Sequence, residues 1–236
     1  MGAHATLVPV NPALLVPVPE GLDDATAATL LLDAVTAQAA LDALGADVTS
    51  VLVQGVGGAV GRLTAQLAAL RGLTVFGTAS ERTRTEGEQL DATVLDYRDP
   101  DWIGDLCRRT SGGVDGLVDH TGSTAIRAAV RPHGRIVSIA FGGAPGHRRT
   151  ATAVGAIRAN TRRFARPAER VCSVPLLVAT RRATYRRLLG GVLELAASGE
   201  LTPPAPLSVP FTDYAAALDA ARTAAPGTKV VLLVNS

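Results

Sequence analysis

The sequence predicts an α/β fold, a doubly wound parallel sheet with helices on both faces. Short apolar strands alternate with helical segments over residues 48–141, which is the pattern of right-handed β–α–β crossovers. Hydrophobic residues make up 47% of the chain and aromatic residues only 3%. Alanine, valine and leucine must therefore fill the core, as is usual in layered α/β folds.

The expected elements follow one another in a regular order. The first twenty residues alternate valine and leucine with proline and suit an edge strand or an extended arm. A helix is expected from Leu22, with Asp23 or Asp24 as its N-cap and Gly45 at its end. Residues 150–180 give no clear pattern. Elsewhere we expect strands at 51–54, 74–78, 93–97, 116–120, 135–141 and 229–234, helices at 62–72, 82–90, 102–109, 123–130, 184–197 and 213–224, and an extended stretch at 203–210.

A glycine-rich turn joins the first strand of this series to its helix. A pyrophosphate needs backbone N–H groups at a helix N-terminus with no side chain in the way. The turn therefore predicts a Rossmann-type dinucleotide site, and the alternative is a tight turn that binds nothing. The residues expected to hold the pyrophosphate are Gly55, Gly57, Gly58, Ala59, Val60 and Gly61.

The end of the second strand bears on the choice of cofactor. NAD-binding folds tend to place an acid there for the ribose 2′-hydroxyl, whereas an arginine suits the 2′-phosphate of NADP. Ser80 lies at this position and is followed by Arg82 and Arg84, so NADP is favoured as the cofactor. Glu81 weakens the distinction, and both arginines could equally belong to a helix surface.

The overall composition narrows the class of protein. The two cysteines have no partner at metal-ligand spacing, so neither a structural zinc nor a disulfide framework is expected. The N-terminus carries no basic residue and several prolines, unlike a secretory signal. No charge-free apolar run approaches the roughly 18 residues of a membrane span. We expect a cytoplasmic protein that binds neither nucleic acid nor membrane.

The net charge of +2 is unevenly spread along the chain. Residues 148–187 contain eleven arginines and one acid, Glu169. Such a block could bind an acidic partner. The alternative is a solvated helical face whose charges pair with acids elsewhere in the fold or in a second subunit.

Several segments together resemble the zinc-free quinone oxidoreductase and enoyl reductase branch of the medium-chain dehydrogenase/reductase superfamily. They run in the family's order from about Leu7 to the C-terminus and include VLVQGVGGAVGRLTAQLAALRGLTVFGTAS, VLDYRD, GLVDHTGS and PHGRIVSIAFGG. The resemblance implies an NADPH-dependent oxidoreductase that reduces a quinone or the carbon–carbon double bond of an enone. It also implies that Tyr97 lies beside the adenosine phosphate, that Thr36 approaches the nicotinamide, and that Phe141 and Gly142 line the nicotinamide pocket.

The chain departs from the family at its N-terminus. The family begins with a GroES-like catalytic domain, and this sequence starts at what resembles its last strand. We therefore expect three segments: a remnant arm at 1–21, the nucleotide-binding domain at 22–200, and a strand–helix–strand remnant at 201–236. A homodimer is expected, because the apolar strand at 135–141 would need covering at an open sheet edge and the family is commonly dimeric.

A second departure suggests acid/base chemistry. Asp119 and His120 follow the fourth strand, at the edge where ligands bind in such sheets. His120 could relay a proton, although a histidine hydrogen-bonded to backbone at a strand end is the commoner situation. Three functions stay open: the reductase, a cofactor-independent cyclase or isomerase of natural-product type that uses Asp119 and His120, and a non-catalytic partner protein.

Overall fold

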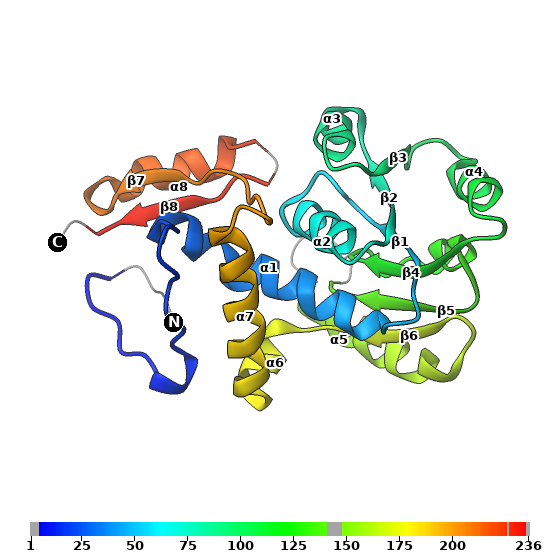
Figure 1. Cartoon of the computed structure of the whole chain (residues 1–236), viewed down its shortest axis with the longest axis horizontal. Helices are drawn as coiled ribbons and strands as arrows, with labels where there is room; N and C mark the ends of the chain where they lie inside the picture. Colours follow the sequence, from blue (N-terminus) through cyan, green and yellow to red (C-terminus); the bar gives the residue numbers. More distant parts are fainter. Residues whose placement is uncertain (1–4, 141–147, 226, 235–236) are drawn as a thin grey trace. The chain divides into compact units, whose positions relative to one another are not determined.

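The computed structural model describes residues 5–140, 148–225 and 227–234, and it divides into two compact units. Unit 2 comprises residues 36–173, and unit 1 comprises residues 1–35 and 174–236. Figure 1 shows the elements of both units. The division into compact units does not test the three segments expected from the sequence, and these stay a prediction.

Unit 2 contains a six-stranded parallel sheet in the order β3-β2-β1-β4-β5-β6. The α/β fold predicted from the alternation of strands and helices is confirmed. The order reverses between β1 and β4, which makes their carboxyl ends the switch point of the sheet. The strands are β1 (Ser50–Val53), β2 (Thr74–Ala79), β3 (Thr93–Asp96), β4 (Val114–Asp119), β5 (Val130–Ser138) and β6 (Ala168–Val171).

The connections of unit 2 are mainly helical (Figure 1). The helix expected at 123–130 is a 3-10 helix, η3. Residues 150–180, for which the sequence predicted no element, contain most of α5 together with η4 and β6. The connecting elements are α2 (Ala59–Leu70), η2 (Glu81–Thr83), α3 (Arg84–Glu88), α4 (Trp102–Arg109), η3 (Ala125–Ala129), α5 (Arg148–Thr161) and η4 (Arg162–Phe164).

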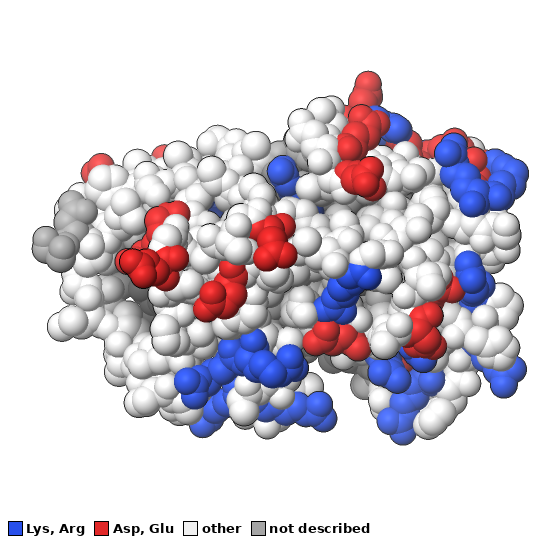
Figure 2. Space-filling model, in the orientation of Figure 1, with Lys and Arg blue, Asp and Glu red and all other residues white. Residues whose placement is uncertain are grey.

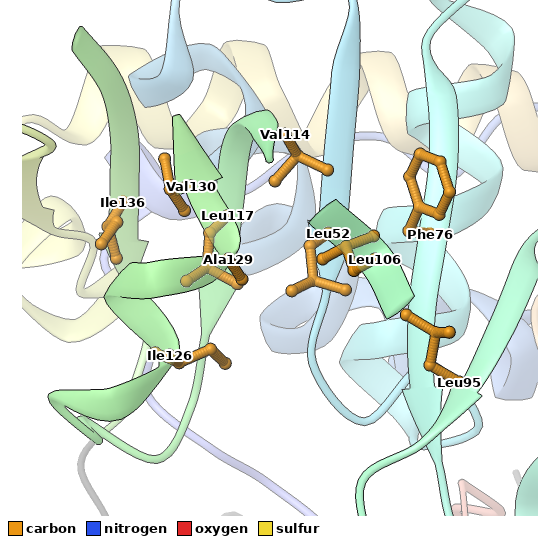
Figure 3. Packing of buried hydrophobic residues seen from close by; sticks show 10 residues of the cluster. All are labelled: Leu52, Phe76, Leu95, Leu106, Val114, Leu117, Ile126, Ala129, Val130 and Ile136. Atoms are coloured by element: carbon orange, nitrogen blue, oxygen red, sulfur yellow. The ribbon is translucent and has the colours of Figure 1, made fainter. Parts of the chain in front are cut away.

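One face of this sheet carries a continuous apolar core. Figure 3 shows side chains from β1 to β5 meeting Leu106 of α4 and Ile126 of η3. Leu52, Leu106 and Leu117 are completely buried. Because α4 and η3 are fixed by this core, the loops that precede them at the carboxyl edge of the sheet are fixed as well.

Strand β5 does not lie at the sheet edge, which corrects the expectation from the apolar segment 135–141. β6 pairs with β5 from Arg135↔Ala168 to Ser138↔Val171 and covers it. This strand could not be recognised in the sequence, because β6 contains the charged Glu169. In the structure the side chain of Glu169 is only 8% exposed. Arg127 bonds this carboxylate and also donates to the carbonyl of Pro167 at 2.8 Å, so the charge is paired inside the fold.

The opposite end of the sheet is held by Asp115. Its Oδ2 accepts hydrogen bonds from the amides and hydroxyls of Thr49 and Ser50 at 2.7–3.0 Å. Its Oδ1 lies 2.9 Å from Nη1 of Arg131. These contacts tie the start of β1 to the start of β4, far from the carboxyl edge.

Helix α1 (Asp24–Leu44) begins and ends as the sequence predicts. Asp23 Oδ1 accepts from the amide of Thr26 at 2.8 Å, and Gly45 follows the helix with a φ of +92°. Among the described helices only α1 is long and apolar enough to cross a membrane, and 61% of its apolar 18-residue stretch is buried. Core helices of soluble proteins can be equally long and apolar, so length and composition are weak evidence for a membrane span.

Unit 1 is built around helix α7 and a small sheet. Strands β7 (Leu207–Pro210) and β8 (Val230–Leu233) pair in parallel and are connected through η5 (Phe211–Asp213) and α8 (Tyr214–Thr223). The remaining elements are η1 (Pro12–Leu14), α6 (Val174–Thr180) and α7 (Arg182–Ala197). No described residue among 5–20 lies in a strand, so the extended arm fits and the edge strand does not.

The polar contacts of unit 1 connect its two chain segments. Tyr185 of α7 donates to the carbonyl of Leu31 at 3.3 Å, and Arg186 donates to the carbonyl of Leu15 at 3.1 Å. Lys229 lies 2.6 Å from the carboxylate of Asp33, whose side chain is only 7% exposed. Burial of that carboxylate makes the ion pair with Lys229 important for unit 1.

The arginine-rich segment is divided between the two units. Arg158 and Arg162 belong to unit 2, whereas the exposed Arg181, Arg182 and Arg187 belong to unit 1. Figure 2 shows blue atoms over α6 and α7. The acidic partner expected for this segment stays a prediction.

Candidate functional site

The glycine turn at the end of β1 is shaped by close backbone packing. Gly55 has a φ of +66°, a conformation that favours glycine. A Cβ on Gly61 would overlap the carbonyl oxygen of Gly55 and lie 2.9 Å from the Cα of Val56. The amide of Val56 donates to the carbonyl of Thr78 at 2.9 Å, which ties the turn to the end of β2. Gly55 and Gly61 are therefore required by geometry.

This turn leaves the N-terminus of α2 uncapped. Gly58 is the N-cap residue and supplies no side chain, and its extended backbone has φ −82° and ψ 168°. Within the described residues, no acceptor bonds the amides of Ala59, Val60 or Gly61. A Cβ placed on Gly58 would have only the carbonyl oxygen of Gly55 within 4 Å, so the space above this residue is open. Free amides at a helix start favour an anion.

A cavity of about 410 Å³ opens beside the glycine turn. The imidazole of His120 stands over Gly55, with Cε1 2.9 Å from the position that a Cβ on that glycine would take. Oε1 of Gln54 is buried and has no hydrogen-bond partner. The wall consists of Gln54, Gly55, Thr78, Tyr97, Trp102, Ile103, His120, Thr121, Ser123, Ala125 and Ile126.

Of these lining residues the sequence predicted only Gly55, Tyr97 and His120, and the large apolar ones were missed. Trp102 and Ile103 begin α4, and Ile126 lies in η3. The sequence position of Trp102 could have identified it as a site residue, because this single tryptophan of the chain follows the carboxyl end of a parallel strand. Periodicity alone assigns such residues to the core, and Ile126 does belong to the core.

The loop after β2 places the residues expected near a 2′-phosphate. Ser80 Oγ and Thr83 Oγ1 lie 3.2 Å apart, and Thr83 packs against Gly57. Arg84 lies 3.8 Å from Glu88 in an exposed pair. Arg82 is exposed and has no ion pair among the described residues. Arg82 is therefore the cation of this loop whose charge no acid offsets.

Asp119 organises the loop that follows β4. Its Oδ1 accepts from the amide and hydroxyl of Thr121 at 2.7 and 2.9 Å, and its Oδ2 accepts from the amide of Gly122 at 2.9 Å. The side chain is almost fully buried. His120, by contrast, is exposed and makes no hydrogen bond to the described part of the chain. Of this predicted pair, only His120 faces the cavity.

The remaining predicted residues are spread over unit 2. Tyr97 lines the cavity with a half-exposed ring. Thr36 lies on α1, is buried, and does not line this cavity. Phe141 and Gly142 lie outside the described residues. Across the ranges that the structure describes, no three histidine, cysteine or acidic residues come together as a metal site would require.

Comparison with known proteins agrees with this architecture. A family model described as zinc-binding dehydrogenase matches residues 90–232. No curated protein matches the sequence. The solved structure of AibC superposes with a TM-score of 0.71 at 24% identity, covering 94% of this chain and 59% of its own.

Two further structures superpose equally well. An alcohol dehydrogenase superfamily protein from Novosphingobium aromaticivorans gives a TM-score of 0.73 at 27% identity, covering 99% of this chain and 71% of its own. A quinone oxidoreductase from Pseudomonas syringae pv. Tomato DC3000 gives 0.71 at 21% identity, covering 94% and 68%. The chain thus spans between 59% and 71% of the length of these proteins. It belongs to the zinc-binding dehydrogenase family of the medium-chain dehydrogenase/reductase superfamily.

Proposed function

We propose that this chain holds NADPH along the carboxyl edge of the unit 2 sheet and acts in an oxidoreductase that reduces a quinone or the double bond of an enone. One observation carries the proposal. The unpaired amides of Ala59, Val60 and Gly61 lie beside a cavity large enough for a nucleoside. This combination is what a dinucleotide requires at the switch point of such a sheet.

The pyrophosphate is assigned to the glycine turn. Three amides and the positive end of α2 favour a negative group there. Gly58 supports the assignment, because no side chain fills the space above its Cα. Gly57 has a different role, since a Cβ there would lie 2.5 Å from the Cβ of Thr83. It lets the loop after β2 approach the turn.

The adenosine is assigned to the cavity of about 410 Å³. Tyr97, Trp102 and His120 bring three aromatic rings to its wall, and a flat heterocycle gains from contact with such rings. The buried Oε1 of Gln54 lacks a donor. An exocyclic amino group or a ribose hydroxyl would supply one, which would remove the cost of an unsatisfied buried acceptor.

The preference for NADP over NAD is assigned to Arg82. A guanidinium group without an acid partner can form two parallel hydrogen bonds with a phosphate. The charge of Arg84 is partly offset by the carboxylate of Glu88, which lies 3.8 Å away. When bound, the cofactor supplies the hydride, and the residues of unit 2 hold its adenosine and phosphate groups in place.

The single tryptophan allows a direct test. Trp102 lines the proposed adenosine cavity, so its fluorescence should change as NADP⁺ is added, and NADP⁺ should bind more tightly than NAD⁺. Replacing Arg82 with Gln should weaken NADP⁺ about tenfold, the effect of one lost charge-assisted contact, and leave NAD⁺ unchanged. Arg108→Gln is the matched control, because Arg108 is an exposed arginine that pairs with Asp101.

Two results would overturn the assignment. One is the absence of both a fluorescence change and a thermal shift with either cofactor at millimolar concentration. The other is equal affinity for NADP⁺ in the wild type and in Arg82→Gln, which would show that Arg82 does not produce the preference for NADP. Oxidation of NADPH in the presence of quinones or enones then tests the reaction itself.

One observation favours a second candidate, a cofactor-independent cyclase or isomerase. His120 faces the cavity without a hydrogen bond to the described part of the chain, and an imidazole in that state can give or take a proton. Under this hypothesis product forms without consumption of NADPH, and His120→Ala abolishes it. Turnover that depends strictly on NADPH would exclude the hypothesis.

We also retain the homodimer as a proposal and place it at β6. This strand has a free edge in the described sheet, and Val171 at its end is 40% exposed. Light scattering that gives the mass of a single chain at all accessible concentrations would contradict this.

A further inference from the structure

A second cavity lies in unit 2, under α5. Its volume is about 180 Å³, and residues from α5, β5, β6 and the loop after β4 line it. Only Thr121 is shared with the larger cavity beside the glycine turn. The wall consists of Asp119, Thr121, Gly122, Thr124, Ser138, Val154, Gly155, Arg158, Ala159, Arg162 and Glu169.

The two acids of this cavity already have partners. Asp119 accepts hydrogen bonds on both oxygens from its own loop. Glu169 is bonded by Arg127, and Arg162 lies 3.7 Å from the same oxygen, beyond hydrogen-bond distance. Neither carboxylate has to turn into the cavity to satisfy its charge.

The arginines exceed the acids by one. The cavity wall carries Arg158 and Arg162 against Asp119 and Glu169, and Arg127, which does not line the cavity, also pairs with Glu169, so one positive charge is in excess. Arg158 carries it, because this side chain has neither an ion pair nor a hydrogen bond within the described ranges. Arg162 retains donors because its distance to Glu169 is too long for a hydrogen bond.

Hydroxyl groups complete the wall. The side chains of Thr124 and Ser138 line the cavity and make no hydrogen bond to the described residues. Ser138 is only 3% exposed. An acceptor placed in the cavity would give both hydroxyls a hydrogen-bond partner.

We propose that this cavity is a binding site for a small monocarboxylate. Its oxygens would lie between the guanidinium groups of Arg158 and Arg162 and accept from Thr124 and Ser138. One unpaired positive charge matches a monoanion and not a phosphate dianion. At roughly 30 Å³ for each water-sized group, the volume admits a ligand of about six non-hydrogen atoms, such as acetate, propionate or pyruvate.

Calorimetry of the full chain with acetate, propionate and pyruvate, in chloride buffer at constant ionic strength, tests the proposal. At least one of them should bind, and Arg158→Gln should weaken it about tenfold, because one charge-assisted contact is lost. Arg163→Gln is the matched control: Arg163 lies close by in η4, stacks on Phe164 at 4.6 Å and does not line the cavity. Ser138→Ala is a second variant, which removes a hydroxyl from the cavity wall and leaves its charge unchanged.

The outcomes separate clearly. Binding that Arg158→Gln weakens and Arg163→Gln preserves supports the site. No binding of any of the three carboxylates overturns it, as does equal weakening by both arginine variants, which reports a diffuse charge effect. Tighter binding of inorganic phosphate than of every carboxylate overturns the charge argument. The proposal does not rest on the dinucleotide, and NADP⁺ added at saturation should leave carboxylate binding in place.

Discussion

Replacing Gly61 with alanine tests whether the glycine turn is as tight as the packing indicates. The new methyl group would overlap the carbonyl oxygen of Gly55 and lie 2.9 Å from the Cα of Val56. All of these are backbone atoms, so the turn must shift as a whole. Overpacking of this kind costs about 1–3 kcal/mol. Alanine also lowers the conformational entropy of the unfolded chain, which offsets about 0.4–1 kcal/mol of this cost.

We expect Gly61→Ala to lower the free energy of unfolding by about 1–2 kcal/mol, which corresponds to roughly 2–8 °C in Tm for a chain of this size. Unfolding in urea, followed through Trp102, measures unit 2 directly. NADP⁺ binding by the same variant should be weakened, because the amides at the start of α2 move with the turn.

Gly191→Ala supplies the control for this experiment. Gly191 lies inside α7, and a Cβ there would meet nothing within 4 Å. Alanine is the better helix former by about 0.5–1 kcal/mol, so this variant should be more stable, as measured by circular dichroism. If Gly61→Ala matches the wild type in stability and in NADP⁺ affinity, the account of the turn is refuted.

Three further predictions concern charge and reactivity. Lys229→Met should destabilise unit 1 by about 1–2 kcal/mol in urea unfolding, because it leaves the buried carboxylate of Asp33 unpaired, and adding Asp33→Asn should restore most of the loss. Burial acts to raise the pKa of Asp115, but hydrogen bonds from the start of β1 outweigh it and lower the pKa below the usual 3.8. Its stabilising contribution is therefore complete above pH 3.8 and is lost as pH falls through the lowered value, so Asp115→Asn should flatten the acid limb of a stability profile. Burial, with a smaller effect of the nearby Asp42, raises the pKa of Cys172 to about 11, so only about one thiol in a thousand is ionised at pH 8 and alkylation of the native protein should be far slower than after unfolding.

Local patterns in the sequence determined much of unit 2. Alternating apolar strands and helices can be recognised without tertiary information because strand and helix periods differ. The glycine turn at Gly55–Gly61 was predicted on the same basis, since its conformation depends on the chain within a few residues. The capping of α1 by Asp23 is equally local.

Tertiary structure decided what the patterns could not. β6 was missed because Glu169 makes its sequence polar. A buried acid in this strand is explained by its ion pair with Arg127, which lies in a distant segment of the chain. The arginine-rich segment looked like one block in sequence, yet folding sends its two halves to different units. Both cavities join loops that are distant along the chain, so Trp102 and Arg158 could be placed in them only by the packed sheet. Charge pairing and loop convergence depend on three-dimensional proximity, which one sequence does not encode as a local pattern.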